Sequence, residues 1–435
     1  MAGRKIGVQR RRQRSLDVIY SWAQHTVRVT RTARRLIQLG FCAGEGVVIQ
    51  VRTSPLLHAV HLAVVELCGV VAHVRRSWTA AELCQCIFPT SNATLLVVDA
   101  LETNFQRALE TLADVPESQL PRIRAVIVLD SGAMEDAMAA LRAGVTVMGA
   151  RDLPPTQATT DAAWTPSLDA LARRVGPDHC CLLAFEYDHV GRIRGAELSH
   201  ENVLFTAAAL VQSLDLVSRD GLVGYLLHHM ASQVLEFYVP IVAGLVVISA
   251  PTYDPPLVRV VAMQKSTAFL ATPATWTRFS DQVYRAKSDK IGLEGCHACY
   301  SILAPLDFEL ERLFKTVDTP IYQLYGTPES SGFAAINFPH AWELGISGRA
   351  LPGTTIRCDE QSHETVLRGR NVFLGYRLSP GPYPERKKSE RVVSSDGWLR
   401  LDQRGFLTPN GFLNISDPTD FVVLAAGDWI PIRPF

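Results

Sequence analysis

The chain has 435 residues, of which 47% are hydrophobic and 20% are charged, so it is long enough for two or three domains with sizeable cores. Its 43 basic residues balance its 43 acidic residues. A net charge of zero argues against a globally basic nucleic-acid-binding protein and against an acidic tail protein. We therefore expect no nucleic acid among its partners.

The first residues form an arginine-rich head without acidic residues. Its basic members are Arg4, Lys5, Arg10, Arg11, Arg12 and Arg14. Such a run suits a mitochondrial or nuclear address or a membrane-surface patch, but chain termini are also commonly solvated and disordered. We expect a disordered head over residues 1–15, and no apolar signal-peptide core follows it.

Residues 16–177 predict a first α/β subdomain, because apolar β-branched runs alternate there with segments of helical period. Helices are predicted at 30–39 and 57–69, and strands at 46–51, 70–74, 95–99 and 125–130. This order predicts a doubly wound parallel sheet with binding loops at the strand ends. The Pro-, Thr- and Asp-rich residues 151–177 predict a connection.

Residues 178–344 predict a second α/β subdomain. Its strands are expected to include 181–185, 245–248 and 268–270. Short strands and turn residues predict a smaller β-rich subdomain over 345–435. The most apolar run, 237–250, contains Pro240 and Gly244, so it predicts a buried core element and no transmembrane segment.

The nine cysteines are scattered and odd in number. Without a secretory signal they indicate free thiols in a reducing compartment, which favours a cytoplasmic location. Cys296 and Cys299 form the only pair with a metal-like spacing. A zinc site needs a second ligand pair, and none lies nearby in the sequence, so we attribute the spacing to chance.

Six segments in the second half carry motifs in a recognisable order. They are 225–233 (YLLHHMASQ), 324–332 (LYGTPESSG), 348–353 (GRALPG), 368–376 (RGRNVFLGY), 396–399 (DGWL) and 410–431, which begins NGFL and ends GDWIP. Together they resemble the acyl-adenylate-forming, AMP-binding superfamily over most of the chain, and most of all long-chain acyl-CoA synthetases of the bubblegum type. The resemblance implies the large N-terminal domain of the adenylate-forming fold.

The resemblance also implies a reaction in two halves. ATP and a fatty acid give acyl-AMP and pyrophosphate, and coenzyme A then displaces AMP. The implied cofactors are ATP or AMP, Mg²⁺ and coenzyme A, and the implied ligand is a long-chain fatty acid or its acyl-adenylate. Long acyl substrates would also be consistent with peripheral contact with the endoplasmic reticulum membrane.

The nucleotide site implied by the resemblance centres on Glu329, which matches the family's Mg²⁺-binding glutamate. A hard oxygen ligand is what Mg²⁺ prefers. Tyr325 matches the ring that stacks on adenine, and Gly326 would permit close approach. Ala304 and Pro305 match the strand-end segment whose backbone flanks adenine. The alternatives for Tyr325 and Glu329 are a core tyrosine and a solvated acid in a turn.

The family's glycine-rich phosphate loop aligns with a segment that keeps only Gly191 and Gly195. Arg194 stands at the lysine position, where arginine can still contact phosphate. The hydroxyl groups and the first glycine are missing. Glu186 and Asp188 instead place negative charge where a phosphate would need donors.

Further matched positions are a mixture of retained and lost groups. His229 matches the position that lines the acyl carboxylate pocket. The family's ribose-binding aspartate aligns with Gln403, and Asp402 lies one residue early. The arginine expected beyond it aligns with Pro418, which offers neither charge nor a backbone donor. The chain ends at Phe435, before the point at which the family continues into a lid domain.

Removing one positioned donor at a developing charge typically costs about a hundred- to a thousandfold in rate, and several donors are missing here. We therefore expect a catalytically impaired acyl-CoA synthetase homologue that acts as a binding or regulatory module. Two alternatives stay open. One is an active, divergent fatty-acid ligase that uses Arg194, Asp402 and Glu329, and the other is a truncated product without function.

Overall fold

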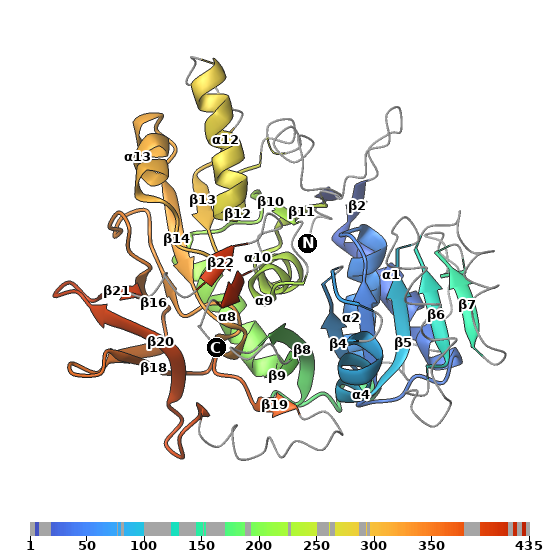
Figure 1. The fold of residues 1–435 in the computed structure, drawn as a ribbon. Coiled ribbons are helices and arrows are strands. Elements are labelled where there is room, and N and C mark those ends of the chain that lie inside the picture. Colours follow the sequence, from blue (N-terminus) through green and yellow to red (C-terminus); the bar gives the residue numbers. More distant parts are fainter. Residues whose placement is uncertain are drawn as a thin grey trace.

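A computed structural model describes most of the chain. The described residues are 5–7, 19–75, 77–79, 82–99, 123–129, 145–150, 152–153, 170–187, 193–224, 228–249, 261, 266–286, 293, 296–377, 392–415, 421–423 and 429–431. Figure 1 shows two large sheets with a group of helices between them.

The first sheet has eight strands in the part of the chain that the structure describes. In spatial order they are β19 (Gly375–Arg377), β9 (Ile193–Ser199), β8 (Cys180–Tyr187), β4 (Val70–His73), β3 (Gly46–Gln50), β5 (Ala93–Val98), β6 (Ala125–Val128) and β7 (Thr146–Gly149). The strands from β8 to β7 are parallel, whereas β9 and β19 are antiparallel. Strands β3 to β6 are buried along their whole length, as expected for apolar strands covered on both faces.

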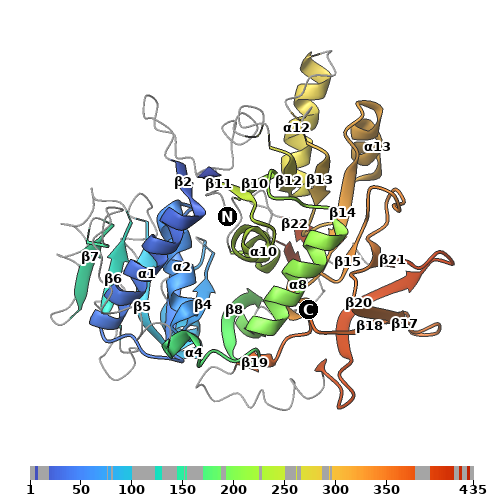
Figure 2. The same ribbon diagram turned by 180° about the vertical axis from the view of Figure 1, so that it is seen from behind.

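Two long helices pack together on this sheet, α1 (Trp22–Gln38) and α2 (Pro55–Glu66) (Figure 2). Ser21 and Gln24 form a capping box at the start of α1, and Ser54 caps α2. The predicted helix at 30–39 is therefore the C-terminal part of a longer one. The capping box of Ser21 and Gln24 was a local signal for where this helix begins.

The second sheet has eleven described strands. In spatial order they are β11 (Val246–Ser249), β10 (Gly221–Gly224), β12 (Ala268–Ala271), β13 (Ala298–Ser301), β14 (Ile321–Tyr325), β15 (Ala335–Ile336), β16 (Gly348–Ala350), β21 (Phe412–Ile415), β20 (Leu399–Leu407), β18 (Glu364–Gly369) and β17 (Thr354–Cys358). The first five are parallel and the rest antiparallel, so one sheet contains both the second α/β layer and the β-rich part.

Helices α12 (Pro273–Ala286) and α13 (Phe308–Thr316) lie against this sheet (Figure 1). Trp276 and Phe279 of α12 are fully buried and pack with Phe269 and Phe314. They form the core on this side of the sheet.

The strand expected at 181–185 does form, as part of β8, but it does not belong to the second sheet. It pairs with β4 in the first sheet, and β9 and β19 extend that sheet further. The assignment of this strand to the second α/β subdomain was therefore wrong. An apolar run predicts that a strand forms, but it carries no information about which strand it pairs with.

Two small hairpins complete the described strands. β1 (Lys5–Gly7) pairs with β2 (Ile19–Ser21), and β22 (Phe421–Val423) pairs with β23 (Trp429–Pro431). Lys5 to Gly7 thus form a strand within the head that we expected to be disordered. The other expected residues of that head, 1–4 and 8–15, lie outside the described residues.

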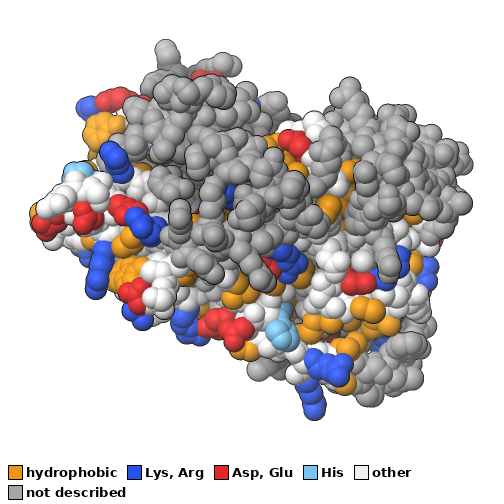
Figure 3. All heavy atoms as spheres, turned by 60° about the horizontal axis from the view of Figure 1, so that its bottom comes forward, with side chains coloured by type: hydrophobic (Ala, Val, Ile, Leu, Met, Phe, Trp, Pro, Cys, Tyr) orange, Lys and Arg blue, Asp and Glu red, His pale blue; other side chains and the backbone are white. Residues whose placement is uncertain are grey.

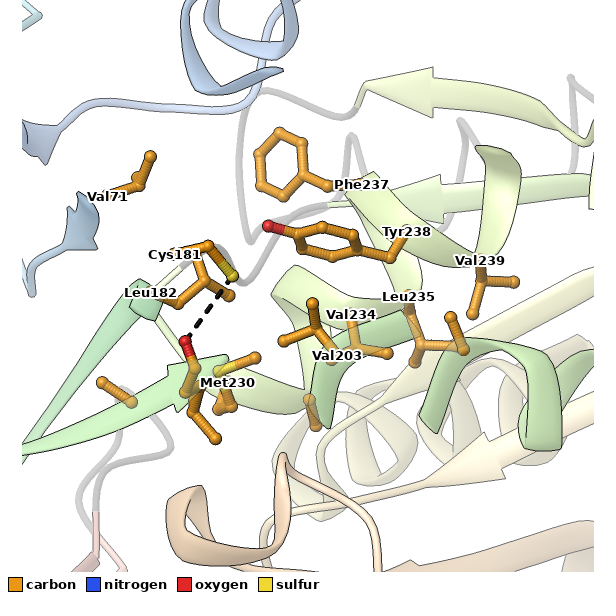
Figure 4. Close-up of a cluster of buried hydrophobic side chains, with 14 of the residues drawn as sticks. Val71, Cys181, Leu182, Val203, Met230, Val234, Leu235, Phe237, Tyr238 and Val239 are labelled. Carbon is orange, nitrogen blue, oxygen red and sulfur yellow. Dashed lines mark hydrogen bonds between the residues drawn. The ribbon is translucent and has the colours of Figure 1, made fainter. Parts of the chain in front are cut away.

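A helical layer lies between the sheets, formed by α8 (His200–Ser213), α9 (Met230–Gln233), the π-helical η3 (Val234–Tyr238) and α10 (Val239–Ala243). Its apolar side chains, among them Val203, Val234 and Phe237, meet those of β8 in one core (Figure 4). The Cys181 thiol donates to the Leu198 carbonyl at 3.6 Å. None of the described helices is both long and apolar enough to cross a membrane.

Buried histidines join the helical layer to the first sheet. His61 Nδ1 lies 2.9 Å from His73 Nε2, and His61 Nε2 lies 3.1 Å from the Tyr238 hydroxyl. Burial lowers the pKa of His73 to about 3 and that of His61 well below its ordinary value. These rings are therefore neutral at pH 7 and act as hydrogen-bonding core residues.

Candidate functional site

The candidate residues gather where several strands end. Glu186, Arg194 and Gly195 lie on the β8–β9 hairpin, His229 directly precedes α9, and Tyr325 ends β14. Gly191, Asp188 and Pro418 lie outside the described residues, and for Asp402 the structure describes only its place in β20. The carboxyl ends of parallel strands are where doubly wound α/β proteins bind their ligands.

The turn after β14 places Glu329 in a single 3₁₀ turn, η4 (Pro328–Ser330). A Cβ atom at Gly326 would lie 2.3 Å from the Gly332 carbonyl oxygen, so the turn folds back tightly on itself at this glycine. The close approach at Gly326 is thus made by the chain's own backbone. This fixes the position of Glu329 relative to Tyr325.

The Glu329 carboxylate is bound within the protein. The Tyr376 hydroxyl donates to Glu329 Oε1 at 2.5 Å, and the Phe373 amide donates to the Glu329 carbonyl at 2.9 Å. Burial and the Glu329 charge raise the pKa of Tyr376 above its ordinary value, so the hydroxyl stays protonated and able to donate. Arg194 lies over the Tyr376 ring, 5.3 Å from its centre. Arg194, Tyr376 and Glu329 therefore form one cluster.

Tyr325 and Gln403 form a second internal pair, because the Tyr325 hydroxyl donates to Gln403 Oε1. Burial raises the pKa of Tyr325, with a smaller contribution from the Glu329 charge, so this tyrosine also remains a donor. The two positions that the family resemblance assigns to adenine and ribose thus contact each other.

A third pair lies at the start of the expected phosphate loop. Arg75, just beyond β4, donates to Glu186 Oε2 at 2.7 Å, and its side chain is only 7% exposed. His229 Nδ1 lies 3.9 Å from Glu186 Oε1. Burial lowers the pKa of His229 well below its ordinary value, with His228 and Arg75 adding to the effect, so its ring is neutral at pH 7. Arg75 therefore supplies the charge that balances Glu186.

The β8–β9 hairpin sets the surroundings of Arg194 and Gly195. Arg194 is the cross-strand partner of Glu186, and Gly195 is that of Phe185. A Cβ at Gly195 would come within 2.9 Å of the Phe185 ring, so the glycine makes room for packing within the sheet. Ser199 caps α8 directly after the hairpin.

Ala304 and Pro305 follow β13 in a loop that begins at Leu303, whose φ is +77°. Ala304 is half-buried and Pro305 is exposed. Sequence reasoning did not include Arg75 or Tyr376 among the site residues. Tyr376 lies within one of the recognised motifs, and Arg75 directly follows a predicted strand, so both carried a usable signal.

Charges of both signs alternate with apolar side chains over the described part of the face shown in Figure 3. Within the described ranges, no group of three or more His, Cys, Asp or Glu residues is arranged to hold a metal ion.

Comparison with known families identifies the class of protein. The family model described as AMP-binding enzyme matches residues 9–377, and the chain belongs to this family.

Curated relatives include the long-chain-fatty-acid–CoA ligase ACSBG2 of Xenopus laevis, which is 23% identical over 418 residues, covering 82% of this chain and 53% of that protein. The human ACSBG2 ligase is 23% identical over 472 residues, covering 96% of this chain and 67% of its own length. The chain thus spans about half to two thirds of these relatives.

Solved structures share the fold. The anthranilate CoA ligase AuaEII in complex with anthranoyl-AMP matches with a TM-score of 0.74 at 17% identity, covering 96% of this chain and 75% of that one. The N-terminal domain of FACL13 from Mycobacterium tuberculosis matches with a TM-score of 0.71 at 19% identity, covering 92% of this chain and 93% of that one. The predicted fold class is confirmed.

Proposed function

We propose that this chain is an acyl-CoA synthetase homologue with impaired adenylation, which acts as a binding or regulatory module for an acyl ligand. The observation that carries the proposal is that polar groups at the expected nucleotide site are paired with one another. Tyr376 donates to Glu329, Tyr325 donates to Gln403, and Arg75 pairs with Glu186.

The residues fit a bound triphosphate poorly. Adenylation requires donors and positive charge around the phosphates, already oriented before reaction. Here a carboxylate, Glu186, takes up the buried guanidinium of Arg75 that could otherwise meet an anion. A phosphate would have to displace the Glu186 carboxylate from Arg75, and the negative charge of Glu186 would still repel it.

The fit to Mg²⁺ is similarly weak. Mg²⁺ is usually held by one or two carboxylates together with substrate phosphates. Glu329 could supply one oxygen, although its Oε1 also accepts from the Tyr376 hydroxyl. The substrate phosphates that would supply other ligands fit poorly, so the site as a whole suits Mg²⁺ poorly.

The ligand we propose is a long-chain fatty acid or its adenylate, which His229 would meet at its carboxyl end. The names of the curated relatives support this class, as does the retained His229. We also propose a cytoplasmic location with peripheral contact at the endoplasmic reticulum. ATP, AMP and coenzyme A remain proposed ligands of the fold, without efficient turnover.

Exchange of pyrophosphate into ATP, measured with a panel of fatty acids, tests the proposal directly. We expect no exchange above background, while calorimetry detects fatty-acid binding. The competing function is an active ligase in which Arg194, Asp402 and Glu329 substitute for the missing groups. It is favoured by the contact of Arg194 with the Tyr376–Glu329 pair. Exchange that is abolished by Glu329→Ala would establish it and overturn the impaired-enzyme proposal.

A further inference from the structure

The helix that follows His229 carries buried polar atoms without partners. His229, Gln233 and Glu236 are 5%, 1% and 1% exposed. Among the described residues, the atoms His229 Nε2, Gln233 Nε2, Gln233 Oε1 and Glu236 Oε2 are buried and have no hydrogen-bond partner. Buried polar atoms are nearly always paired, so four unpaired atoms on consecutive turns require an explanation.

These side chains lie on one face of the helix. The Gln233 amide donates to the His229 carbonyl at 3.1 Å, which places the two residues on successive turns. Glu236 follows three residues later, a spacing that returns to the same face. It belongs to η3, and π-helical turns are frequent at functional sites.

This face meets the carboxyl ends of strands from both sheets. Glu236 packs on Gly224, the last residue of β10, where an added Cβ would lie 2.2 Å from Glu236 Oε2. The Thr53 hydroxyl, in the segment after β3, donates to Glu236 Oε1, and it also lies 3.3 Å from the hydroxyl of Ser249, which ends β11. The row therefore runs from the His229 end of the candidate site into the junction between the sheets, where α/β proteins hold their ligands.

The chemistry of Glu236 selects the ligand. His58 Nε2 lies 2.8 Å from Glu236 Oε1, which also accepts from Thr53. Oε1 thus already has two partners, whereas Oε2 has none and could accept from a donor on the ligand. An unsubstituted acyl chain would bury these polar atoms without bonds, which is unfavourable.

We propose that the face formed by His229, Gln233 and Glu236 binds an organic acid whose chain carries a hydroxyl group, with the hydroxyl donating to Glu236 Oε2. This rests on the proposed function, since it takes His229 to lie at the acyl carboxyl group, and it narrows the ligand class. Glu236 lies seven positions after His229 along the helix, so the hydroxyl should lie about 10 Å from the carboxyl group.

Calorimetry with 8-hydroxyoctanoic acid and nonanoic acid tests this, because the two acids differ only in a terminal hydroxyl or methyl group. Both are measured without ATP, so the result does not depend on whether the chain can adenylate. We expect the hydroxy acid to bind about ten- to a hundredfold more tightly, the usual range for a hydrogen bond to a charged group. Equal affinity, tighter binding of nonanoic acid, or binding of neither acid would overturn the inference.

Two variants test whether the preference for the hydroxy acid depends on Glu236 and Gln233. Glu236→Gln should reduce the difference in affinity between the two acids to a few-fold, because an amide can present an NH₂ group where the carboxylate accepts. Gln233→Met should also weaken it and does not remove a bond made within the protein. Leu235→Met, a volume-conserving change on the same helix, should leave it unchanged. A preference that survives both Glu236→Gln and Gln233→Met would refute the assignment, whatever the exchange assay shows about adenylation.

Discussion

Replacing Glu186 by glutamine should both destabilise the protein and open an anion site. The Glu186→Gln change removes the charge partner of Arg75, whose side chain is only 7% exposed, whereas that of Glu186 is 35% exposed. Breaking a fully buried pair costs about 3–5 kcal/mol, and an exposed pair contributes about 0.2–1 kcal/mol. Because this pair lies between those limits, we expect the free energy of unfolding to fall by about 1–2 kcal/mol.

Pyrophosphate should then restore the lost stability, since Arg75 would have lost its carboxylate partner and an anion could take the place of that carboxylate. A ligand at about a hundred times its dissociation constant stabilises the folded state by about 2.7 kcal/mol. Urea denaturation with and without pyrophosphate measures the effect. The parent protein should respond much less, because its own carboxylate occupies Arg75.

Glu197→Gln is the matched control, because Glu197 lies on the same β8–β9 hairpin and pairs with Arg377 of β19, and both side chains are 25% exposed. It should destabilise the protein without creating the response to pyrophosphate. Two results would refute the reasoning. One is a Glu186→Gln variant as stable as the parent, and the other is a parent protein stabilised by pyrophosphate as strongly as the variant.

Three further predictions concern the fold around the site. Gln233→Met should raise the free energy of unfolding of the unliganded protein by about 1–3 kcal/mol, because it removes an unpaired buried amide; a loss in urea denaturation would show that the amide is paired. Gly326→Ala should lower the free energy of unfolding by more than about 2 kcal/mol, because the added Cβ would meet backbone atoms. Gly411→Ala should lower it by about 1 kcal/mol, because Gly411 has φ +78° but lies in open space. Equal shifts in the thermal unfolding of the two variants would contradict this. Burial lowers the pKa of His25 and His73 from 6.5 to about 3. Between these two values the unfolded state binds more protons than the folded state. The contribution of these histidines to stability is therefore present above pH 6.5 and is lost as the pH falls towards 3. When the pH falls from 8 to 5.5, these two histidines together should lower the free energy of unfolding by about 3 kcal/mol. An unchanged midpoint of urea denaturation over that range would contradict the lowered pKa values.

Local pattern was enough to predict most of the elements but not their partners. The strands at 46–51, 70–74 and 125–130 form because continuous β-branched runs suit a sheet that is covered on both faces. The pairing of β8 with β4 depends on contacts between residues about 110 positions apart, which no local pattern encodes.

The candidate site shows the same division. The motif around Glu329 led us to expect a Mg²⁺-binding glutamate, with an acid in a turn as the alternative, and the structure places Glu329 in the turn η4. That Tyr376 would occupy the carboxylate could not be predicted, because it depends on β19 joining β9 and thereby placing Tyr376 beside Arg194. Likewise, Glu186 was expected to repel an anion, and only the fold shows that Arg75 balances its charge.

The position of β19 also has a consequence for how the chain folds. It is the edge strand of the first sheet beside β9, yet Gly375–Arg377 are synthesised long after the rest of that sheet. Until they emerge, β9 exposes unpaired backbone groups, and such an edge readily pairs with other chains. Fragments that end before residue 375 should therefore aggregate more readily than fragments that include β19. A fragment of this protein made for expression should therefore contain all the strands of a sheet, even where those strands lie far apart in the sequence.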